Sequence, residues 1–432
     1  MAGQEGRFNY GWVVVGLAVV SVTAAVGARA AFAVFFLSMA QEYGWGRAVT
    51  SGAYSLNGLV YALGLPISGL LLDRFSPRAV FAVASVLLGL GIFLMSGVRS
   101  LLHLYLLFGL LAPAGGALLV MPGQSTVVTR WFVRGRGAAM GFASTGWGLG
   151  FLVMVPLADW LIRHLGWRQA YMALGLGILG VVGGLNLLFQ RRPPPPRTPR
   201  ARANPILPEQ GQTARVDDAA LPVLAAASAA SGVGWTFDRA IRSWPFWALF
   251  LGAVTGMYGG HMLLVHQVAV VAETAGDRAF ASWIGGMAGL VSTVSLIACG
   301  AISDRLGREV TYNVGSLFLV VAFVLLIAYP TFPAPWVPYA YALTFGLGFG
   351  SRPSMYPVMA ADRFEGRDQG KIFGSISVGF ALAAMTGPWS AGVVYDRLAD
   401  YRPVLALAAV LTVVSSAVIW SVRIRRPAPS LE

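Results

Sequence analysis

The chain has 432 residues, of which 56% are hydrophobic and only 11% are charged. A soluble globular domain carries about 25% charged residues, so this chain cannot cover itself with a water-facing surface. The composition excludes an ordinary soluble enzyme and a disordered tail protein, and the single cysteine excludes a disulfide scaffold. The net charge of +13 does not indicate a nucleic-acid partner, because the positive residues fall in short loops between long apolar runs.

Long apolar stretches recur along the whole chain. A transmembrane helix needs about 20 mostly apolar residues, and twelve stretches meet this length. The sequence therefore predicts an all-α integral membrane protein with twelve spans, which are 12–38, 49–72, 79–98, 101–128, 137–160, 169–189, 245–271, 280–303, 311–330, 336–361, 372–394 and 403–422.

The distribution of Lys and Arg predicts the orientation of these spans. When the N-terminus is placed inside, the inner segments hold about three times as many Lys and Arg residues as the outer ones, which is the bias of cytoplasmic loops. We therefore expect both termini to be cytoplasmic, in a bacterial-type inner membrane.

The middle of the chain differs from the rest. Residues 191–243 contain a basic, proline-rich run followed by polar and alanine-rich sequence, which has little to bury. We interpret this segment as a cytoplasmic linker between a six-helix bundle at 1–190 and a second one at 244–432. Residues 234–247 mix aromatic and basic side chains, so they predict either a surface helix on the membrane or a plain basic connector.

The two halves repeat each other. Two motifs end the second and eighth spans about 230 residues apart, and their matching residues are Gly69, Asp73, Arg74 and Arg78, then Gly300, Asp304, Arg305 and Arg308. A basic, glycine-containing segment before the fifth span, 130–141, recurs before the eleventh at 363–374. Parallel six-helix repeats of this kind place a substrate at the repeat interface, near the middle of the bilayer.

With these motifs the sequence resembles the major facilitator superfamily. Within it the chain looks most like the monocarboxylate transporter and oxalate:formate antiporter group, through residues 9–12 at the entry, 29–36 in the first span, 42–47 after it, 166–168 before the sixth and 387–392 in the eleventh. The resemblance implies that spans 1, 4, 7 and 10 line a central cavity. It also implies that the eight motif residues above stabilise one conformation, with Arg130, Arg134 or Arg363 as partners of the two aspartates.

Two arginines lie deep in predicted spans. Arg29 is in the first span and Arg352 in the tenth, and no acidic residue lies at a comparable depth. A charge at mid-bilayer costs about 2.5–3.5 kcal/mol, and guanidinium binds carboxylate bidentately. Both arginines are therefore candidates for binding an anionic substrate, although each could instead reach an interface or donate to helix carbonyls. Pro353 and the glycines before it predict an interrupted helix at Arg352.

Further polar side chains lie in the spans expected to line the cavity. His261 and His266 in the seventh span are candidate proton carriers, and His261 matches Arg29 in the repeat, so it is also a candidate for substrate binding. Both could equally be hydrogen-bonded packing residues. Gln124, Tyr258 and Tyr356 are further candidate substrate contacts, with helix packing as the alternative for each.

Catalytic and metal-binding patterns are not found in the sequence. The histidines have no acidic or cysteine companions, no nucleophile motif is present, and no Walker loop indicates ATP. We therefore expect no enzyme activity, no metal and no cofactor.

These observations predict a secondary transporter that moves a small organic anion, a monocarboxylate by resemblance, through rocker-switch alternating access with proton coupling. The expected partners are the anion, protons and the lipid bilayer, without nucleic acid, and a monomer suffices. Anion exchange and proton-driven efflux of an amphiphilic compound remain alternatives within transport. A receptor or a membrane enzyme would belong to another class; counterflow would distinguish transport from ligand binding without flux.

Overall fold

The computed structural model describes residues 10–132, 136–191, 234–366 and 368–423. Across these residues the secondary structure is helical. The N-terminal half forms six rods, several built from successive segments: α1 (Gly11–Tyr43), α2 (Arg47–Arg74), α3 (Pro77–Leu94) with η1 (Met95–Gly97), α4 (Leu101–Leu104) with η2 (Tyr105–Leu111), α5 (Ala112–Leu119) and α6 (Met121–Trp131), α7 (Arg136–Leu149) with η3 (Gly150–Met154) and α8 (Val155–Leu165), and α9 (Trp167–Gly177) with η4 (Ile178–Gly183) and α10 (Gly184–Phe189).

The C-terminal half also forms six rods, after one short helix. They are α12 (Phe237–Ile241), which is the short one, and then α13 (Trp244–Ala275), α14 (Arg278–Leu306), α15 (Arg308–Ala328), α16 (Val337–Arg363), α17 (Gln369–Leu398) and α18 (Arg402–Ser421). Each predicted span lies within one of the twelve rods, apart from a residue or two at some ends.

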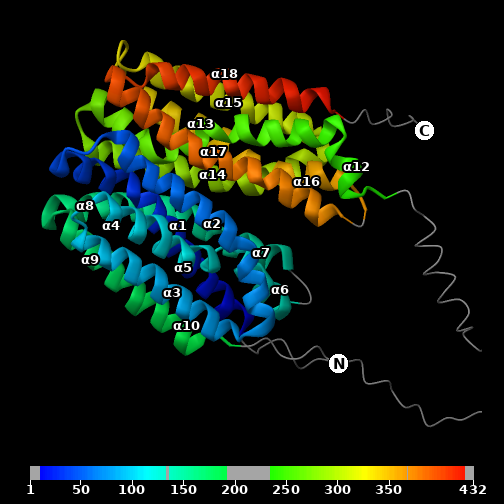
Figure 1. The fold of residues 1–432 in the computed structure, drawn as a ribbon, viewed down its shortest axis with the longest axis horizontal. Coiled ribbons are helices and arrows are strands. Elements are labelled where there is room, and N and C mark those ends of the chain that lie inside the picture. The colour runs from blue at the N-terminus through cyan, green and yellow to red at the C-terminus, as the bar shows by residue number, and fades with distance from the viewer. Residues whose placement is uncertain (1–9, 133–135, 192–233, 367, 424–432) are drawn as a thin grey trace, which may run out of the picture.

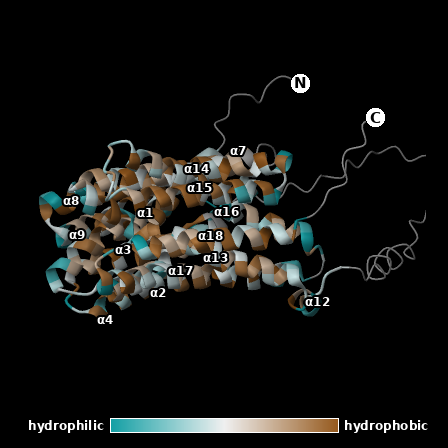
Figure 2. Ribbon diagram, turned by 90° about the horizontal axis from the view of Figure 1, so that it is seen from above, coloured by the Kyte–Doolittle hydropathy of each residue, from teal (hydrophilic) through white to brown (hydrophobic). Residues whose placement is uncertain are grey.

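Eleven of these rods are long and apolar enough to cross a membrane. The remaining rod is α16, the tenth in chain order. It is 27 residues long but carries more polar residues, among them Arg352 and Asp362. Hydrophobic residues run along the length of the rods and hydrophilic residues gather at both ends (Figure 2). This distribution suits a protein whose middle lies in the hydrocarbon of a bilayer.

The two halves lie side by side as separate bundles (Figure 1). They meet where α2 packs on α17, where α14 packs on α7, η3 and α8, and where α1 packs on α13. We call the end of the molecule that holds Tyr10, Arg191, Gly234 and Arg423 the linker end. The other end, which holds Trp45, Gly166 and Asp277, is the opposite end.

The helix break that proline predicted for the tenth rod occurs instead in the fourth rod. Val120 is extended between α5 and α6, so this rod is broken there. The expectation of an interrupted helix at Arg352 was wrong, because α16 is continuous through Pro353 and Pro357. Hydroxyl groups support the backbone around this proline, since Ser351 Oγ donates to the Gly348 carbonyl (2.8 Å) and Ser354 Oγ to the Ser351 carbonyl (3.1 Å).

The segment predicted as a surface helix contains the short helix α12. The Trp235 N–H donates to the Glu365 carbonyl (3.1 Å), and the Phe237 N–H donates to Asp368 Oδ2 (3.1 Å). These bonds attach α12 to the C-terminal half near the start of α17. Its position on a membrane surface stays a prediction, and residues 192–233 of the predicted linker lie outside the described residues.

Candidate functional site

Arg29 is the deep cation of the N-terminal half. It is half-buried on α1, and its guanidinium carbon lies 4.5 Å from the centroid of the Tyr54 ring and 5.1 Å from that of Tyr61. Both rings belong to α2, so α2 presents two aromatic faces to the cation. Such cation–π contacts hold the guanidinium in place without neutralising its charge.

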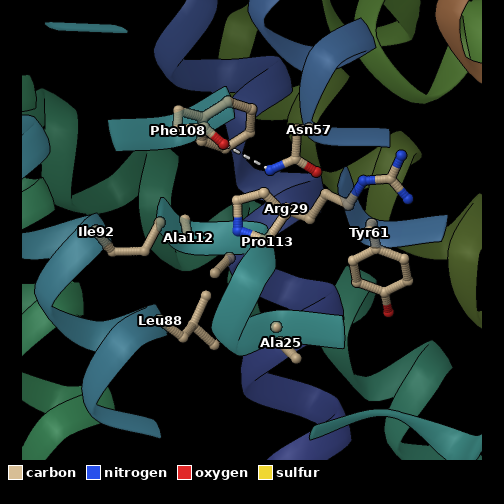
Figure 3. Close-up of a pocket in the computed structure, with 11 residues that line it drawn as sticks. Ala25, Arg29, Asn57, Tyr61, Leu88, Ile92, Phe108, Ala112 and Pro113 are labelled. Carbon is tan, nitrogen blue, oxygen red and sulfur yellow. Dashed lines mark hydrogen bonds between the residues drawn. The ribbon is translucent and has the colours of Figure 1, made fainter. Parts of the chain in front are cut away.

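A small cavity lies beside the Arg29 side chain. It measures about 10 Å³, the space of one water molecule, and is lined by Arg29, Asn57 and Tyr61 together with apolar residues of α3, η2 and α5. Asn57 Nδ2 donates to the Phe108 carbonyl in the π-helical turn η2 (2.8 Å). In Figure 3 the guanidinium points away from Leu88 and Ile92 and toward the side of Tyr61. The charged end of Arg29 is therefore directed out of this cavity.

His261 lies on α13, which packs on α1, the helix that carries Arg29. The two residues that match each other in the repeat therefore lie on contacting helices from different halves. His261 Nδ1 lies 3.0 Å from the Met257 carbonyl oxygen, which can only accept, so Nδ1 carries a proton. The neutral ring then presents Nε2 as an acceptor. Arg29 and His261 together offer a fixed cation from one half and a proton acceptor from the other.

Arg352 is placed differently. It is fully buried, with one guanidinium nitrogen donating to Tyr312 OH (2.5 Å) and the other to Ser316 Oγ (3.2 Å), both on α15. Its guanidinium carbon lies 4.8 Å from the centroid of the Tyr312 ring. These contacts lie inside the C-terminal half, so the structure does not bring Arg352 together with Arg29. Among the described residues, no carboxylate forms an ion pair with it.

The other candidate substrate contacts, Tyr356, Tyr258 and Gln124, form hydrogen bonds with neighbouring protein groups. Tyr356 OH donates to the Gly252 carbonyl (2.6 Å) and lies 2.7 Å from Tyr312 OH, so it belongs to the Arg352 network. Tyr258 OH lies 2.5 Å from Ser390 Oγ, between α13 and α17. Gln124 is buried and its Nε2 donates to the Leu119 carbonyl beside the break in the fourth rod (3.2 Å). Their roles as substrate contacts stay predictions.

His266 is fully buried near the opposite end. Its Nε2 lies 3.0 Å from the Pro388 carbonyl oxygen and its Nδ1 lies 2.9 Å from Tyr401 OH. Its neighbours therefore differ from those of His261, which are the Met257 carbonyl and the Phe349 ring.

The repeated motifs lie at the linker end, where the second rod of each half meets its third. Asp73 pairs with Arg130 (3.4 Å), one of the partners suggested by the resemblance. Asp304 pairs with Arg308 of its own motif (2.5 Å). Arg363 pairs instead with Glu309 (3.4 Å), and Arg134 lies outside the described residues. Arg308 also reaches Asp362 at the end of α16 (3.5 Å), so the second motif ties three rods of its half together.

The sequence analysis missed the charged contacts that join the halves at the opposite end. Arg47 at the start of α2 pairs with Glu273 at the end of α13 (2.8 Å), and Arg278 at the start of α14 pairs with the buried Asp159 on α8 (3.1 Å). The signal was present in the repeat, because Arg47 and Arg278 occupy matching positions in the two halves. The sequence did not show that either arginine pairs with a carboxylate of the other half.

The described residues contain no group of three or more His, Cys, Asp or Glu side chains placed to hold a metal ion. The candidate site consists of the Arg29–His261 pair between the halves, with Arg352 and its tyrosines inside the C-terminal half.

Comparison with known proteins agrees with this architecture. Bovine monocarboxylate transporter 13 is 27% identical over 415 residues, covering 95% of this chain and 89% of that protein. Rat monocarboxylate transporter 3 is 29% identical over 414 residues, covering 93% and 77%. A solved bacterial homologue of the lysosomal transporter Spinster, in an inward-facing unoccupied conformation, superposes with a TM-score of 0.71 at 16% identity and 97% coverage of both chains.

The nucleoside transporter NupG superposes with a TM-score of 0.68 at 12% identity, covering 96% of this chain and 99% of that one. The sequence also matches the Major Facilitator Superfamily over residues 17–357 and 267–432. With twelve rods in two six-helix halves and a repeated motif at matching places, the chain belongs to the Major Facilitator Superfamily and is related to the monocarboxylate transporters.

Proposed function

We propose that this protein is a secondary transporter of a small organic anion, a monocarboxylate, coupled to protons. The observation that carries the proposal is the placement of Arg29 and His261, since each half contributes one of these polar groups on the contacting helices α1 and α13. The family relationship to monocarboxylate transporters supports the substrate class.

The chemistry of the pair suits an anion and a proton. Arg29 is held by two tyrosine rings and has no carboxylate partner among the described residues, so its charge is available to a substrate carboxylate. The free Nε2 of His261 can take a proton beside the bound anion. The proton would offset the anion's charge, which matters when a monoanion moves toward a negative interior.

Rocker-switch alternating access follows from how the halves are joined. At the opposite end, ion pairs connect α2 to α13 and α14 to α8. At the linker end, the described ion pairs of both motifs stay within one half. The halves are thus held together by ion pairs at the opposite end. In a rocker-switch cycle, this arrangement corresponds to the state that is closed at that end.

The proposed topology places the linker end in the cytoplasm. The bundles then comprise residues 1–190 and 244–432, joined by a cytoplasmic linker at 191–243, in a monomeric inner-membrane protein. In this orientation the structure is closed toward the outside. Its substrate would be released toward the cytoplasm from this state.

Two alternatives within transport remain distinct hypotheses. An anion exchanger would use Arg29 without a proton on His261. A proton-driven efflux pump for an amphiphile would be expected to rely on a buried acid facing the interface. The buried Asp159 is already paired with Arg163 (2.9 Å) and Arg278 (3.1 Å), which favours the anion transporter over the pump.

The test is uptake of short labelled monocarboxylates into proteoliposomes, with and without an inward proton gradient. Wild-type uptake is expected to accelerate with the gradient. The variant Arg29→Gln is expected to lose about tenfold or more of the initial rate, because a charge-assisted hydrogen bond contributes about 1.5–3 kcal/mol. The exposed loop residue Arg99 provides a matched control, and Arg99→Gln should transport normally.

The outcomes separate the hypotheses. Uptake that ignores the gradient but requires anion inside the vesicles would favour exchange. Flux of an amphiphile without flux of any carboxylate would favour efflux and contradict the proposal. Normal uptake by Arg29→Gln would remove Arg29 from the site.

A further inference from the structure

The opposite end is closed by a cluster of side chains that we call the Arg47 latch: Arg47 on α2, with Glu273, Tyr395, Asp396 and Tyr401 from the other half. The Arg47 guanidinium pairs with Glu273 (2.8 Å), donates to Tyr401 OH (2.6 Å) and stacks 3.5 Å from the centroid of the Tyr395 ring. One side chain of the N-terminal half thus binds three side chains of the C-terminal half.

Asp396 completes the latch through the backbone. The first N–H groups of α2 have no side-chain cap from their own half, and Asp396 accepts from the N–H of Arg47 (2.7 Å) and of Ala48 (2.9 Å). A carboxylate at a helix N-terminus satisfies unpaired donors and complements the helix dipole. Gly46 allows this approach, since a Cβ there would lie 2.7 Å from the Asp396 carboxylate.

A second latch joins the halves at the matching place of the repeat. Arg278 at the start of α14 pairs with Asp159 (3.1 Å) and donates to the Val34 carbonyl (2.5 Å) and Ser38 Oγ (3.0 Å) on α1. The two latches are related by the repeat but differ in one respect. The position in the N-terminal half that matches His266 is occupied by Val34, so the second latch has no histidine at the place where His266 adjoins the Arg47 latch.

Arg47, Tyr401 and His266 are joined by successive hydrogen bonds, and the partners determine which atom donates in each bond. The Pro388 carbonyl can only accept, so His266 Nε2 carries a proton. Tyr401 oxygen accepts from Arg47 and its hydroxyl proton is free to point at His266 Nδ1. Burial raises the pKa of Tyr401, so this hydroxyl keeps its proton. The closed latch therefore requires a neutral His266 that accepts at Nδ1.

We propose that His266 makes the Arg47 latch sensitive to protons, so that protonation of its Nδ1 opens the opposite end. A proton on Nδ1 removes the acceptor of the Tyr401 hydroxyl and places a second cation one hydroxyl group away from Arg47. The inference rests on the proposed alternating access, but it does not depend on which substrate is moved.

The other charged groups around His266 do not cancel this effect. Glu273 on α13 is paired with Arg47, and Asp396 on α17 is bonded to the start of α2. From α1, the group facing the imidazole is the uncharged ring of Phe36, edge-on at 5.2 Å between centroids. A protonated His266 thus gains no carboxylate hydrogen bond while the latch is closed.

The experiment measures opening at the opposite end in the reconstituted full chain. Spin labels at Arg99→Cys and Thr331→Cys, in a Cys299→Ala background, report the distance between exposed loops of the two halves. Lowering the pH from about 8 to about 5, across the range where histidine titrates, is expected to raise the ratio of open to closed molecules about tenfold, equivalent to one pKa unit of difference between the states.

The variant His266→Gln keeps a donor for Pro388 and an acceptor for Tyr401 but cannot be charged, so its distances are expected to ignore pH. Tyr401→Phe keeps the ring but removes the hydroxyl that links His266 to Arg47, so its pH response is expected to be weaker than that of the wild type. Asp159→Asn weakens the second latch and should shift the ratio at every pH while retaining the pH response. A pH response that persists in both His266→Gln and Tyr401→Phe would overturn the proposal, as would a wild type that does not respond.

These results are separable from carboxylate transport. A distance that changes with pH, in a protein that does not take up monocarboxylates, would support the proton-sensitive latch and contradict the proposed substrate. Monocarboxylate uptake by a protein whose distance does not change with pH would support the proposed substrate and contradict the proton-sensitive latch.

Discussion

At the scale of single residues, Arg352 is the most unusual side chain in the protein. It is fully buried, donates to the hydroxyl groups of Tyr312 and Ser316 in place of a carboxylate, and leaves its Nε without a partner. A buried cation without an anion costs several kcal/mol. In membrane proteins such a residue is usually retained for function rather than for stability.

We therefore predict that Arg352→Met lowers the transport rate without lowering the stability of the protein. Its partners stay satisfied without it, because Tyr312 OH also bonds Tyr356 and Ser415, and Ser316 Oγ donates to the Tyr312 carbonyl. We expect the melting temperature in detergent to stay level or rise, while the rate of monocarboxylate uptake falls about tenfold or more.

The comparison of melting temperature with uptake decides the role of Arg352. A fall of several degrees in the melting temperature would show that the guanidinium holds the C-terminal half together. A stable variant with normal uptake would exclude Arg352 from substrate binding. As a control, Arg29→Gln should reduce uptake without raising stability, since Arg29 is only half-buried.

At the scale of elements, α16 packs against α14 through two glycines. A Cβ at Gly350 would collide with the Ser292 carbonyl of α14, and one at Gly346 would meet Val291 Cβ at 2.5 Å. Glycines four residues apart lie on one face of a helix and allow two helices to approach closely. The position of Arg352, two residues after Gly350, depends on this contact.

We therefore predict that Gly350→Ala destabilises the protein by about 1–3 kcal/mol, the usual cost of overpacking, and lowers its melting temperature. Gly374 on α17 is the matched control, because a Cβ there would meet nothing within 4 Å. Gly374→Ala should be neutral or slightly stabilising, since alanine favours helix. Equal melting temperatures for the two variants would contradict close packing of α16 on α14.

Element lengths were readable from hydropathy, but helix breaks were not. Proline and glycine near residue 352 predicted a break, but α16 is continuous there and packs closely on α14 through Gly346 and Gly350. The actual break at Val120 lies two residues before Pro122 and is supported by Gln124, whose amide donates to the Leu119 carbonyl. Whether a proline interrupts a membrane helix depends on which neighbours satisfy the backbone, and sequence alone does not contain that information.

At the scale of the whole molecule, the charged latches distinguish the two ends. Ion pairs between the halves are concentrated at the opposite end among the described residues, with Arg47 and Arg278 at matching places. If the proposed topology is correct, a membrane-impermeant maleimide added outside intact cells should label Thr331→Cys. It should label Asp238→Cys only after permeabilisation.

Both labelling positions are exposed, and the background for both is Cys299→Ala. Labelling of Asp238→Cys in intact cells, with Thr331→Cys protected, would reverse the orientation. In that case the closed end would face the cytoplasm instead of the outside.

The sequence by itself determined the number and limits of the membrane rods, the repeat, and the family, because hydropathy and motif spacing are local properties of the chain. It also named Arg29 and His261 as matching residues, and these lie on the contacting helices α1 and α13. It predicted Arg352 as a deep cation but could not say that its side chain turns toward α15, since depth along a helix does not give rotation about its axis.

Only the tertiary structure decided which charges meet. Arg47 and Asp396 are far apart in the chain, and so are Arg278 and Asp159, yet each pair closes the same end of the molecule. Such contacts depend on how the two bundles pack against each other. That arrangement is set by packing across their interface, which no local pattern of residues records.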